Sequence, residues 1–197
     1  MLRVGLTGGI ATGKSYVLDR FRKRGVPGID SDELAHGVTS AGTESAAAIA
    51  KRFGPEMLTP DGSVDRAKLG AIVFADPAAR RDLEAIVHPA VYGAIRTAIR
   101  RFERLNEHAL VVVDVPLLFE TGHESDFDRV IVTACPPEMQ IARLRARGMS
   151  EGDARRRLAA QWPTDRKASR ADFVIRTDGT FAETDAQVDH VLRSLTP

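Results

Sequence analysis

The sequence predicts an α/β protein in which helices cover a parallel β-sheet of about five strands. Three observations support this prediction. A glycine-rich loop lies between a strand pattern and a helix pattern near the start of the chain, and residues 109–115 and 129–134 form two further, mostly apolar strand patterns. Because a strand that is apolar on both faces must be covered on both faces, such runs suit the centre of a parallel sheet.

The opening segment has the order strand, loop, helix. Residues 2–6 form a short strand pattern, and a helix is expected over 15–24, where the apolar residues follow helical spacing. The loop between them reads Gly8-Gly9-Ile10-Ala11-Thr12-Gly13-Lys14-Ser15. This spacing of glycines before Lys and Ser is typical of a loop that binds the phosphates of a nucleotide. The alternative is an ordinary glycine-rich turn before a helix.

Each part of the loop has a chemical reason. Gly8 and Gly13 allow a tight turn that points successive N–H groups at anionic oxygens. Lys14 can reach the β- and γ-phosphates, and the Ser15 hydroxyl can ligate Mg²⁺. The positive end of the helix that follows adds to the attraction for phosphate. The sequence therefore predicts a site for a nucleoside triphosphate, with Ser15 able to ligate Mg²⁺.

Between residues 32 and 107 the strand patterns disappear and helical spacing takes over. Asp65 can cap one helix, and Asp76-Pro77 is a start signal for another. His88-Pro89 is expected to end that helix and to begin a third. We predict a helical lobe over 34–108 that binds the acceptor substrate; the alternative is that these helices only elaborate the fold.

The remainder of the chain returns to the α/β pattern. Helical sequence follows the strand at 129–134, with a break at Gly148, and a last strand at 173–175 precedes a helix over 181–195. We predict three parts: a nucleotide-binding core, a lobe and a lid. The core comprises residues 1–33, 109–139 and 163–197. The lobe comprises residues 34–108, and the lid comprises residues 140–162.

Composition limits the function classes. The net charge of +1 over 197 residues gives no general electrostatic case for binding nucleic acid or a membrane. Cys135 is the single cysteine, which excludes an intrachain disulfide and multi-cysteine metal sites. Strand-like sequence from Leu2 leaves no room for a secretory signal, and no apolar run is long enough to span a bilayer. By elimination we expect a cytoplasmic protein. Separately, we expect small-molecule substrates and a monomer or weak homo-oligomer.

Acidic residues follow two of the predicted strands. Asp30 and Asp32 come after the strand pattern at 26–29, and Asp114 ends the run at 109–115. Ligands of open parallel sheets bind at the carboxyl ends of the strands. Asp32 can accept the proton of an acceptor hydroxyl, and Asp30 can position that hydroxyl or the metal. Asp114 can help to hold Mg²⁺. The alternative for Asp30 and Asp32 is helix capping.

Three other features are candidates for binding. The apolar run Pro116-Leu117-Leu118-Phe119-Glu120 can line an acceptor pocket or form a packed loop. Arg143 and Arg147 are four residues apart on a predicted helix face, where they can clamp a phosphoryl group or simply face solvent. His88 can contact the substrate or only cap a helix.

Taken together, these segments resemble the dephospho-coenzyme A kinases over nearly the full length of the chain. The resemblance rests on an ordered set of motifs: Gly5-Leu6-Thr7-Gly8-Gly9-Ile10, Gly13-Lys14-Ser15, Asp30-Ser31-Asp32, His88-Pro89, Val115-Pro116-Leu117-Leu118-Phe119-Glu120, Arg143-Leu144 to Arg147, Gln161 with Lys167, and Ala171-Asp172-Phe173-Val174-Ile175. It implies a P-loop kinase-type three-layer α/β/α core with a helical lobe and a helical lid. It further implies ATP-dependent phosphorylation of the ribose 3′-hydroxyl of dephospho-coenzyme A, with Mg²⁺.

The resemblance also implies roles for single residues. Asp32 matches the catalytic base, and Lys14 and Arg143 match groups that act on the phosphates. The implied ATP contacts are Gly9, Ile10, Ala11, Thr12, Gly13, Lys14, Ser15, Tyr16, Arg143, Arg147, Thr177 and Gly179. The implied acceptor contacts are Thr7, Asp32, His88, Leu118, Phe119 and Glu120, and the implied metal ligands are Ser15 and Asp114.

The chain departs from the family pattern at several positions. Ala11-Thr12 replaces the usual Gly-Ser, Tyr16 replaces a small hydroxyl residue, and no asparagine precedes Gly179. Two other functions stay open from the residues alone. One is a small kinase for a nucleoside, a nucleotide or a shikimate-like alcohol. The other is a nucleotide-dependent switch with little transfer activity.

Overall fold

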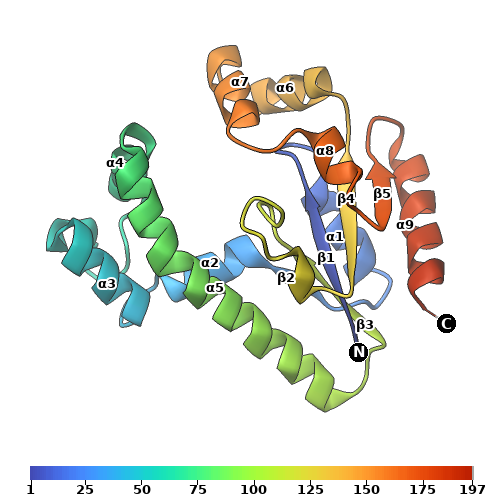
Figure 1. Cartoon of the computed structure of the whole chain (residues 1–197), viewed down its shortest axis with the longest axis horizontal. Helices are drawn as coiled ribbons and strands as arrows, with labels where there is room; N and C mark the ends of the chain where they lie inside the picture. Colours follow the sequence, from blue (N-terminus) through green and yellow to red (C-terminus); the bar gives the residue numbers. More distant parts are fainter. Residues whose placement is uncertain (197) are drawn as a thin grey trace. The chain divides into compact units, whose positions relative to one another are not determined.

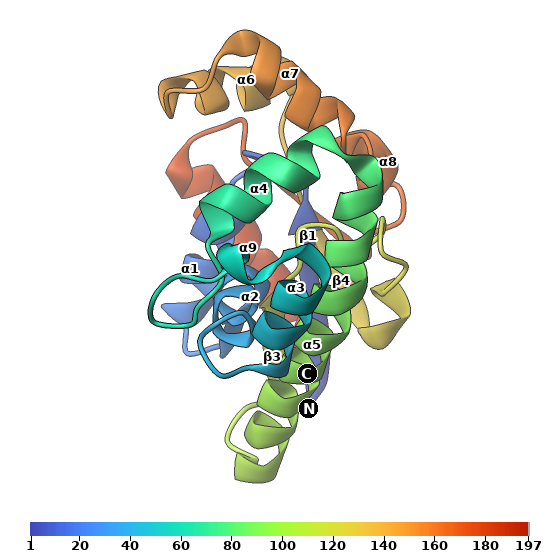
Figure 2. The same ribbon diagram turned by 90° about the vertical axis from the view of Figure 1, so that its left-hand side faces the viewer.

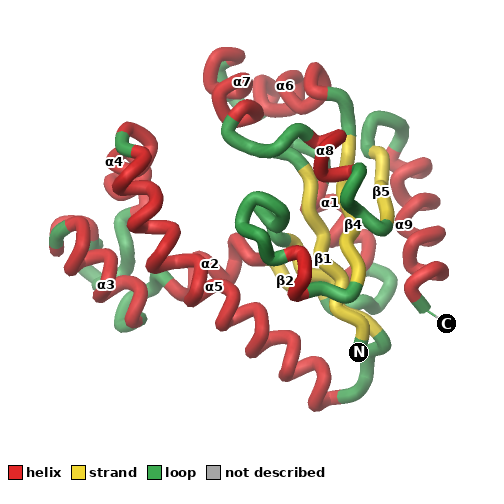
Figure 3. The backbone as a smooth tube through the Cα atoms, in the orientation of Figure 1, coloured by secondary structure: helices red, strands yellow, loops and turns green. Residues whose placement is uncertain are grey.

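The computed structural model of the protein describes residues 1–196 and divides into two compact units, Met1–Asp30 with Arg101–Pro197, and Ser31–Arg100. The first unit holds a parallel sheet in the strand order β2-β3-β1-β4-β5, drawn as yellow segments in Figure 3. The strands are β1 (Leu2–Gly8), β2 (Gly28–Asp30), β3 (Leu110–Asp114), β4 (Arg129–Ala134) and β5 (Phe173–Arg176). The predicted α/β class and five-stranded parallel sheet are confirmed.

The most deeply buried strands lie inside the sheet. All residues of β3 are buried, as the apolar run predicts. β1 lies at the centre of the sheet between β3 and β4, with Leu6 opposite both Asp114 and Ile131. The glycine-rich loop therefore leaves the carboxyl end of the central strand, with a neighbouring strand on each side.

Helices cover the sheet of the first unit (Figure 1). They are α1 (Lys14–Arg22), α6 (Pro137–Ala146), α7 (Glu151–Ala159), α8 (Thr164–Ala168) and α9 (Phe181–Leu195), with a short 3₁₀ turn at Glu124–Asp126. Phe21 of α1 and Val188 of α9 are fully buried in one apolar cluster with Leu6 of β1. This shared cluster places α1 and α9 on the same face of the sheet.

The second unit is helical. It contains α2 (Ser31–Val38), α3 (Glu44–Phe53), a 3₁₀ turn at Pro55–Met57, α4 (Arg66–Ala75) and most of α5 (Pro77–Leu105) (Figure 2). The Asp65 side chain accepts a hydrogen bond of 3.0 Å from the backbone N–H of Lys68, which confirms the predicted cap. The buried core of this unit is an apolar cluster of Ala46, Ile49, Met57, Val64 and Leu69.

The prediction that His88-Pro89 separates two helices is wrong. α5 runs through Pro89 without interruption and has 29 residues. A proline inside a helix costs about 3 kcal/mol. Buried side chains on the following turns, Val91, Tyr92 and Ile95, each contribute roughly 1.5–3 kcal/mol to packing, which offsets that cost.

None of the helices in residues 1–196 is long and apolar enough to cross a membrane.

Three smaller differences concern candidate site residues. α2 begins at Ser31, directly after β2, so Asp32 lies in the first turn of a helix. α6 ends at Ala146 and Arg147 takes a non-helical conformation beyond it, so Arg147 and Arg143 do not share a helix face. The helix α8 was not predicted, because its five residues are too few to show periodicity.

Candidate active site

The glycine-rich loop has the backbone shape that its glycines predict. Gly8 has φ of 156° and Gly13 has φ of 88°. A Cβ atom on Gly8 would lie 2.4 Å from the hydroxyl and 2.6 Å from the carbonyl oxygen of Thr133 on the neighbouring strand. Only glycine therefore fits where the loop leaves β1.

Side chains from several elements hold the carbonyl groups of this loop. The oxygens of Gly8, Gly9, Ile10, Ala11 and Thr12 each accept a hydrogen bond, respectively from Lys167 Nζ (3.3 Å), Thr12 Oγ1 (2.7 Å), Gln140 Nε2 (2.6 Å), an Arg143 guanidinium nitrogen (3.1 Å) and Thr177 Oγ1 (2.8 Å). In a trans peptide unit the N–H points away from the C=O. Fixing these carbonyls therefore fixes the direction of the N–H groups between them, which is what an anion-binding nest requires.

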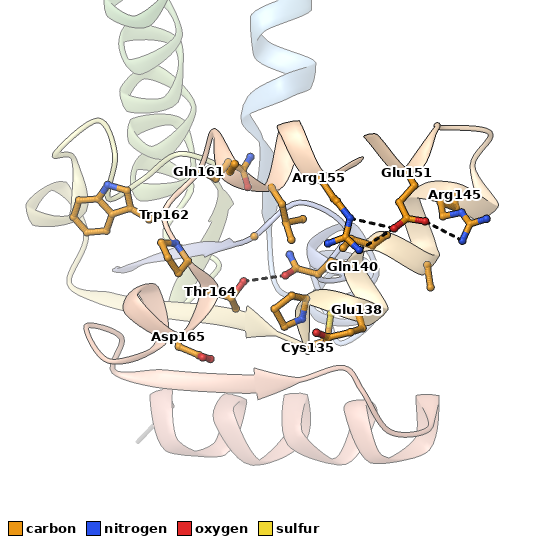
Figure 4. Close-up of a pocket in the computed structure, with 17 residues that line it drawn as sticks. Cys135, Glu138, Gln140, Arg145, Glu151, Arg155, Gln161, Trp162, Thr164 and Asp165 are labelled. Carbon is orange, nitrogen blue, oxygen red and sulfur yellow. Dashed lines mark hydrogen bonds and ion pairs between the residues drawn. The ribbon is translucent and has the colours of Figure 1, made fainter. Parts of the chain in front are cut away.

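The Ile10 segment is held by two glutamines. Gln140 donates to the Ile10 carbonyl, and Gln161 Oε1 accepts a hydrogen bond of 2.8 Å from the Ile10 N–H. Gln140 is buried, and its own Oε1 accepts from the Thr164 hydroxyl at 3.4 Å, the dashed line between these two residues in Figure 4. The loop is thus attached to both ends of the segment that contains α6 and α7.

Arg143 joins the loop to the segment after β5. Its guanidinium donates to the Ala11 carbonyl, to Thr177 Oγ1 at 3.1 Å and to the Thr177 carbonyl at 2.5 Å. Thr177 is buried, and Gly179 lies exposed two residues later. The structure therefore brings Arg143 and Thr177 to the loop, while Arg147 is exposed beyond the end of α6.

Oxygen donors suited to Mg²⁺ lie at the carboxyl ends of adjacent strands. Ser15 is exposed in the first turn of α1, and the buried Asp114 ends β3 opposite Asp30 of β2. Mg²⁺ prefers such oxygen ligands and usually completes its shell with phosphates and waters. Residues 1–196 contain no group of three or more His, Cys, Asp or Glu side chains that could hold a metal alone. Ser15, Asp30 and Asp114 supply the type of oxygen donor that Mg²⁺ takes, and their role as metal ligands stays a prediction.

We call residues 116–120 the acceptor segment. The Leu118 and Phe119 side chains are 0% and 3% exposed, so the packed-loop alternative describes these two side chains. Thr7 Oγ1 donates to the Pro116 carbonyl at 3.2 Å. Glu120 Oε1 accepts from the Trp162 N–H at 2.9 Å and pairs with Lys167 Nζ at 2.8 Å. A role for Leu118, Phe119 and Glu120 in binding the acceptor stays a prediction.

The second unit carries Asp32 and His88. Asp32 is exposed in the first turn of α2, and His88 is half-buried within α5. Arg66 of α4 donates to the Ala35 carbonyl at 2.7 Å and to Thr39 Oγ1 at 2.8 Å. Burial lowers the pKa of Arg66 and the charge of Asp32 raises it, so the two side chains interact within this unit.

Two cavities lie beside these residues. In the second unit, a cavity of about 230 Å³ is lined by Arg66 and by apolar side chains that include Ile49, Leu69 and Val87. In the first unit, a cavity of about 660 Å³ lies between α6, α7 and the segment 161–165 (Figure 4). Of the glycine-rich loop Gly9 lines the larger cavity, so that cavity adjoins the predicted phosphate site at this residue.

Several of these residues were absent from the predicted site. Thr133, Gln140 and Arg66 carry no motif of their own, and Lys167 appeared only as part of the family resemblance. Their contacts with the loop or with Asp32 join residues far apart in the chain, so neither spacing nor residue type indicates them. A polar residue on an otherwise apolar strand, such as Thr133, is the one local signal that was available.

A parallel sheet with a phosphate loop at the end of its central strand, followed directly by a helix, defines a phosphate-loop nucleotide-binding protein. The dephospho-CoA kinase family model, CoaE, matches residues 2–183. A dephospho-CoA kinase from Anaeromyxobacter dehalogenans is 48% identical over 193 residues, which cover 98% of this chain and 91% of that protein. The chain belongs to the dephospho-CoA kinase family and is a kinase with ATP as co-substrate.

Solved structures agree with this assignment. The chain is similar to TT1252 from Thermus thermophilus, with a TM-score of 0.83, 34% identity and coverage of 100% of this chain and 98% of that one. It is also similar to a dephospho-CoA kinase from Campylobacter jejuni, with a TM-score of 0.75, 28% identity and coverage of 98% and 96%. The likeness extends over the whole of each chain, not over the phosphate loop alone.

Proposed function

We propose that this protein transfers the γ-phosphoryl group of ATP to the ribose 3′-hydroxyl of dephospho-coenzyme A, which yields coenzyme A and ADP. Membership of the dephospho-CoA kinase family supports the choice of acceptor. The observation that carries the proposal is the phosphate loop whose carbonyl groups are held from outside by Lys167, Gln140, Arg143 and Thr177. Held carbonyl groups fix the direction of the peptide units of the loop, which supports a role in binding phosphates.

We assign the chemistry as follows. Lys14 and the loop N–H groups neutralise charge on the β- and γ-phosphates. Asp32 removes the proton of the 3′-hydroxyl while the hydroxyl oxygen attacks the γ-phosphorus. ADP is the leaving group. Ser15 and Asp114 would hold Mg²⁺, which supplies further charge neutralisation when bound.

The remaining predicted residues surround this centre in the proposal. Arg143 supports the loop and, with Thr177 and Gly179, contacts the nucleotide. Tyr16 contacts ATP next to the phosphate loop. Arg147 contacts ATP from the lid over 140–162. Residues 34–108, which include His88, form the acceptor lobe, and residues 1–33, 109–139 and 163–197 form the nucleotide-binding core. We further propose a cytoplasmic monomer or weak homo-oligomer, since ATP is an intracellular co-substrate.

The test is ADP release by the purified protein with Mg-ATP and one acceptor at a time. The panel comprises dephospho-coenzyme A, nucleosides, nucleotides and shikimate, with identification of the product by mass. We expect strong stimulation by dephospho-coenzyme A alone. A Lys14→Ala protein prepared in parallel controls for contaminating kinases. Turnover on another acceptor, without response to dephospho-coenzyme A, would refute the proposed substrate while the phosphate site stands.

A further inference from the structure

Lys167 is a charged side chain enclosed within the first unit. Its side chain is 0% exposed. The ammonium group pairs with Glu120 Oε1 at 2.8 Å and donates to the Pro116 carbonyl at 3.1 Å and to the Gly8 carbonyl at 3.3 Å. These contacts match the three N–H donors that a lysine has. Lys167 therefore has no donor left for a substrate.

The three contacts connect the two halves of the proposed reaction. Gly8 is the first residue of the phosphate loop, whereas Pro116 and Glu120 belong to the acceptor segment. Glu120 also accepts from the N–H of Trp162, the last residue of the predicted lid. One ammonium group thus fixes the spacing between the loop that binds the donor phosphates and the segment expected at the acceptor.

Stability alone does not explain this ion pair. Burial lowers the pKa of Lys167 and the nearby charge of Lys14 lowers it further, while Glu120 raises it. Taking two charges out of water costs several kcal/mol per ion, and apolar residues of similar volume are often at least as stabilising. Retaining a buried ion pair at this point is better explained by the fixed geometry that hydrogen bonds provide.

We propose that Lys167 and Glu120 are a positioning pair that sets the acceptor segment at a fixed distance from the phosphate loop. In this proposal Glu120 acts through Lys167 and the Trp162 N–H, and not by contacting the acceptor. The proposal rests on the proposed function, because it names the residues that align the acceptor with ATP. A misalignment of about 1 Å can lower a rate by about 10²-fold.

The test compares Lys167→Met, Glu120→Gln and the double variant Lys167→Met with Glu120→Leu. Melting temperature, kcat, and KM for each substrate are measured for all proteins, wild type included. We expect each single variant to raise KM for dephospho-coenzyme A about tenfold and to lower kcat. KM does not depend on the folded fraction, so a purely structural role would leave it unchanged.

The double variant separates alignment from stability. It replaces the buried charges by apolar groups, so we expect its melting temperature to return toward wild type while kcat/KM for dephospho-coenzyme A stays at least about tenfold low. Recovery of activity together with melting temperature would overturn the proposal. If the double variant does not fold, the KM values of the single variants decide.

Two comparisons complete the design. Asp189→Asn, which removes the partner of Arg24 between α1 and α9, controls for the loss of an ion pair elsewhere and is expected to keep both KM values. An effect of Glu120→Gln without an effect of Lys167→Met on KM would mean that Glu120 contacts the acceptor directly, which contradicts the proposal. Failure of the wild-type protein to phosphorylate dephospho-coenzyme A would instead refute the proposed function.

Discussion

The phosphate loop keeps its shape by one kind of force, and the second unit keeps its shape by another. Each carbonyl from Gly8 to Thr12 meets a side-chain donor, mostly from a distant part of the chain. The second unit is organised around an apolar cluster that includes Ile49, Met57 and Leu69. Hydrogen bonds fix direction, whereas apolar packing fixes volume and shape. Polar changes near the loop should therefore alter catalysis, and apolar changes in the second unit should mainly alter stability.

The largest effect is expected from Lys14→Ala. This change removes the charge that faces the β- and γ-phosphates in the proposed mechanism, and kcat should fall about 10³-fold. Coupled measurement of ADP release checks it. Lys23→Ala, at an exposed lysine of the same region paired with Asp19, is the matched control and should keep wild-type activity. A kcat within tenfold of wild type would contradict the assigned role of Lys14.

Asp32→Asn should lower kcat by about 10²-fold while ATP still binds, because only the proton acceptor is lost. Nucleotide binding is measured by calorimetry beside the kinetic assay. Glu33→Gln, at the exposed neighbouring carboxylate, serves as control. A near-normal rate for Asp32→Asn would remove Asp32 from the role of base and would weaken the view that the second unit contributes chemistry.

Gln140→Ala tests whether the direction of the loop peptides matters. The Ile10 carbonyl loses its donor, so the N–H of Ala11 is no longer held in place, and KM for ATP should rise about tenfold. Glu138→Gln, exposed on the same helix, is the control. An unchanged KM for ATP would show that the loop keeps its shape without the Gln140 contact, which contradicts the view that this hydrogen bond sets the direction of the loop peptides.

Ile49→Val tests the other side of the comparison. Ile49 is fully buried, and loss of one methylene should cost about 1 kcal/mol of stability. Because the cluster sets volume, KM for ATP should not change. Urea unfolding together with ATP kinetics checks both statements. A rise in KM for ATP without loss of stability would mean that packing in the second unit also controls the nucleotide site.

The smallest effect is expected from Asp128→Asn in the first unit. The hydrogen bond from the Arg3 guanidinium is the main reason why the pKa of Asp128 lies below its ordinary value. The contribution of Asp128 is therefore complete above the ordinary pKa of about 4 and is lost as pH falls through the lower folded-state value. Both side chains are about a third or more exposed, so about 0.5 kcal/mol is expected at pH 7. Unfolding at pH 7 and at pH 3 should show the variant and wild type converging in acid.

The sequence predicted those features that depend on neighbouring residues. The phosphate loop, the buried strand β3 and the cap at Asp65 follow from local spacing and residue type. Pro89 shows the limit of such rules, since tertiary packing keeps α5 continuous where the local preference predicts a break.

The support of the site depended on contacts that are distant in sequence. Lys167 lies 159 residues after Gly8, and Gln140 lies 130 residues after Ile10. A lysine or glutamine on a short helix is usually solvated, so its residue type gives no reason to expect it beneath a loop. The identity of the loop was therefore predictable, and the means by which it is held was not.

The separation in sequence between the loop and its hydrogen-bond donors has a consequence for the synthesis of the chain. The loop leaves the ribosome well before Gln140, Arg143, Lys167 and Thr177, which follow it in the chain. The nascent chain carries the complete motif long before any of its donors exist. We therefore expect the loop to gain its full support, and with it its affinity for ATP, only after these donors have been made and have folded against it.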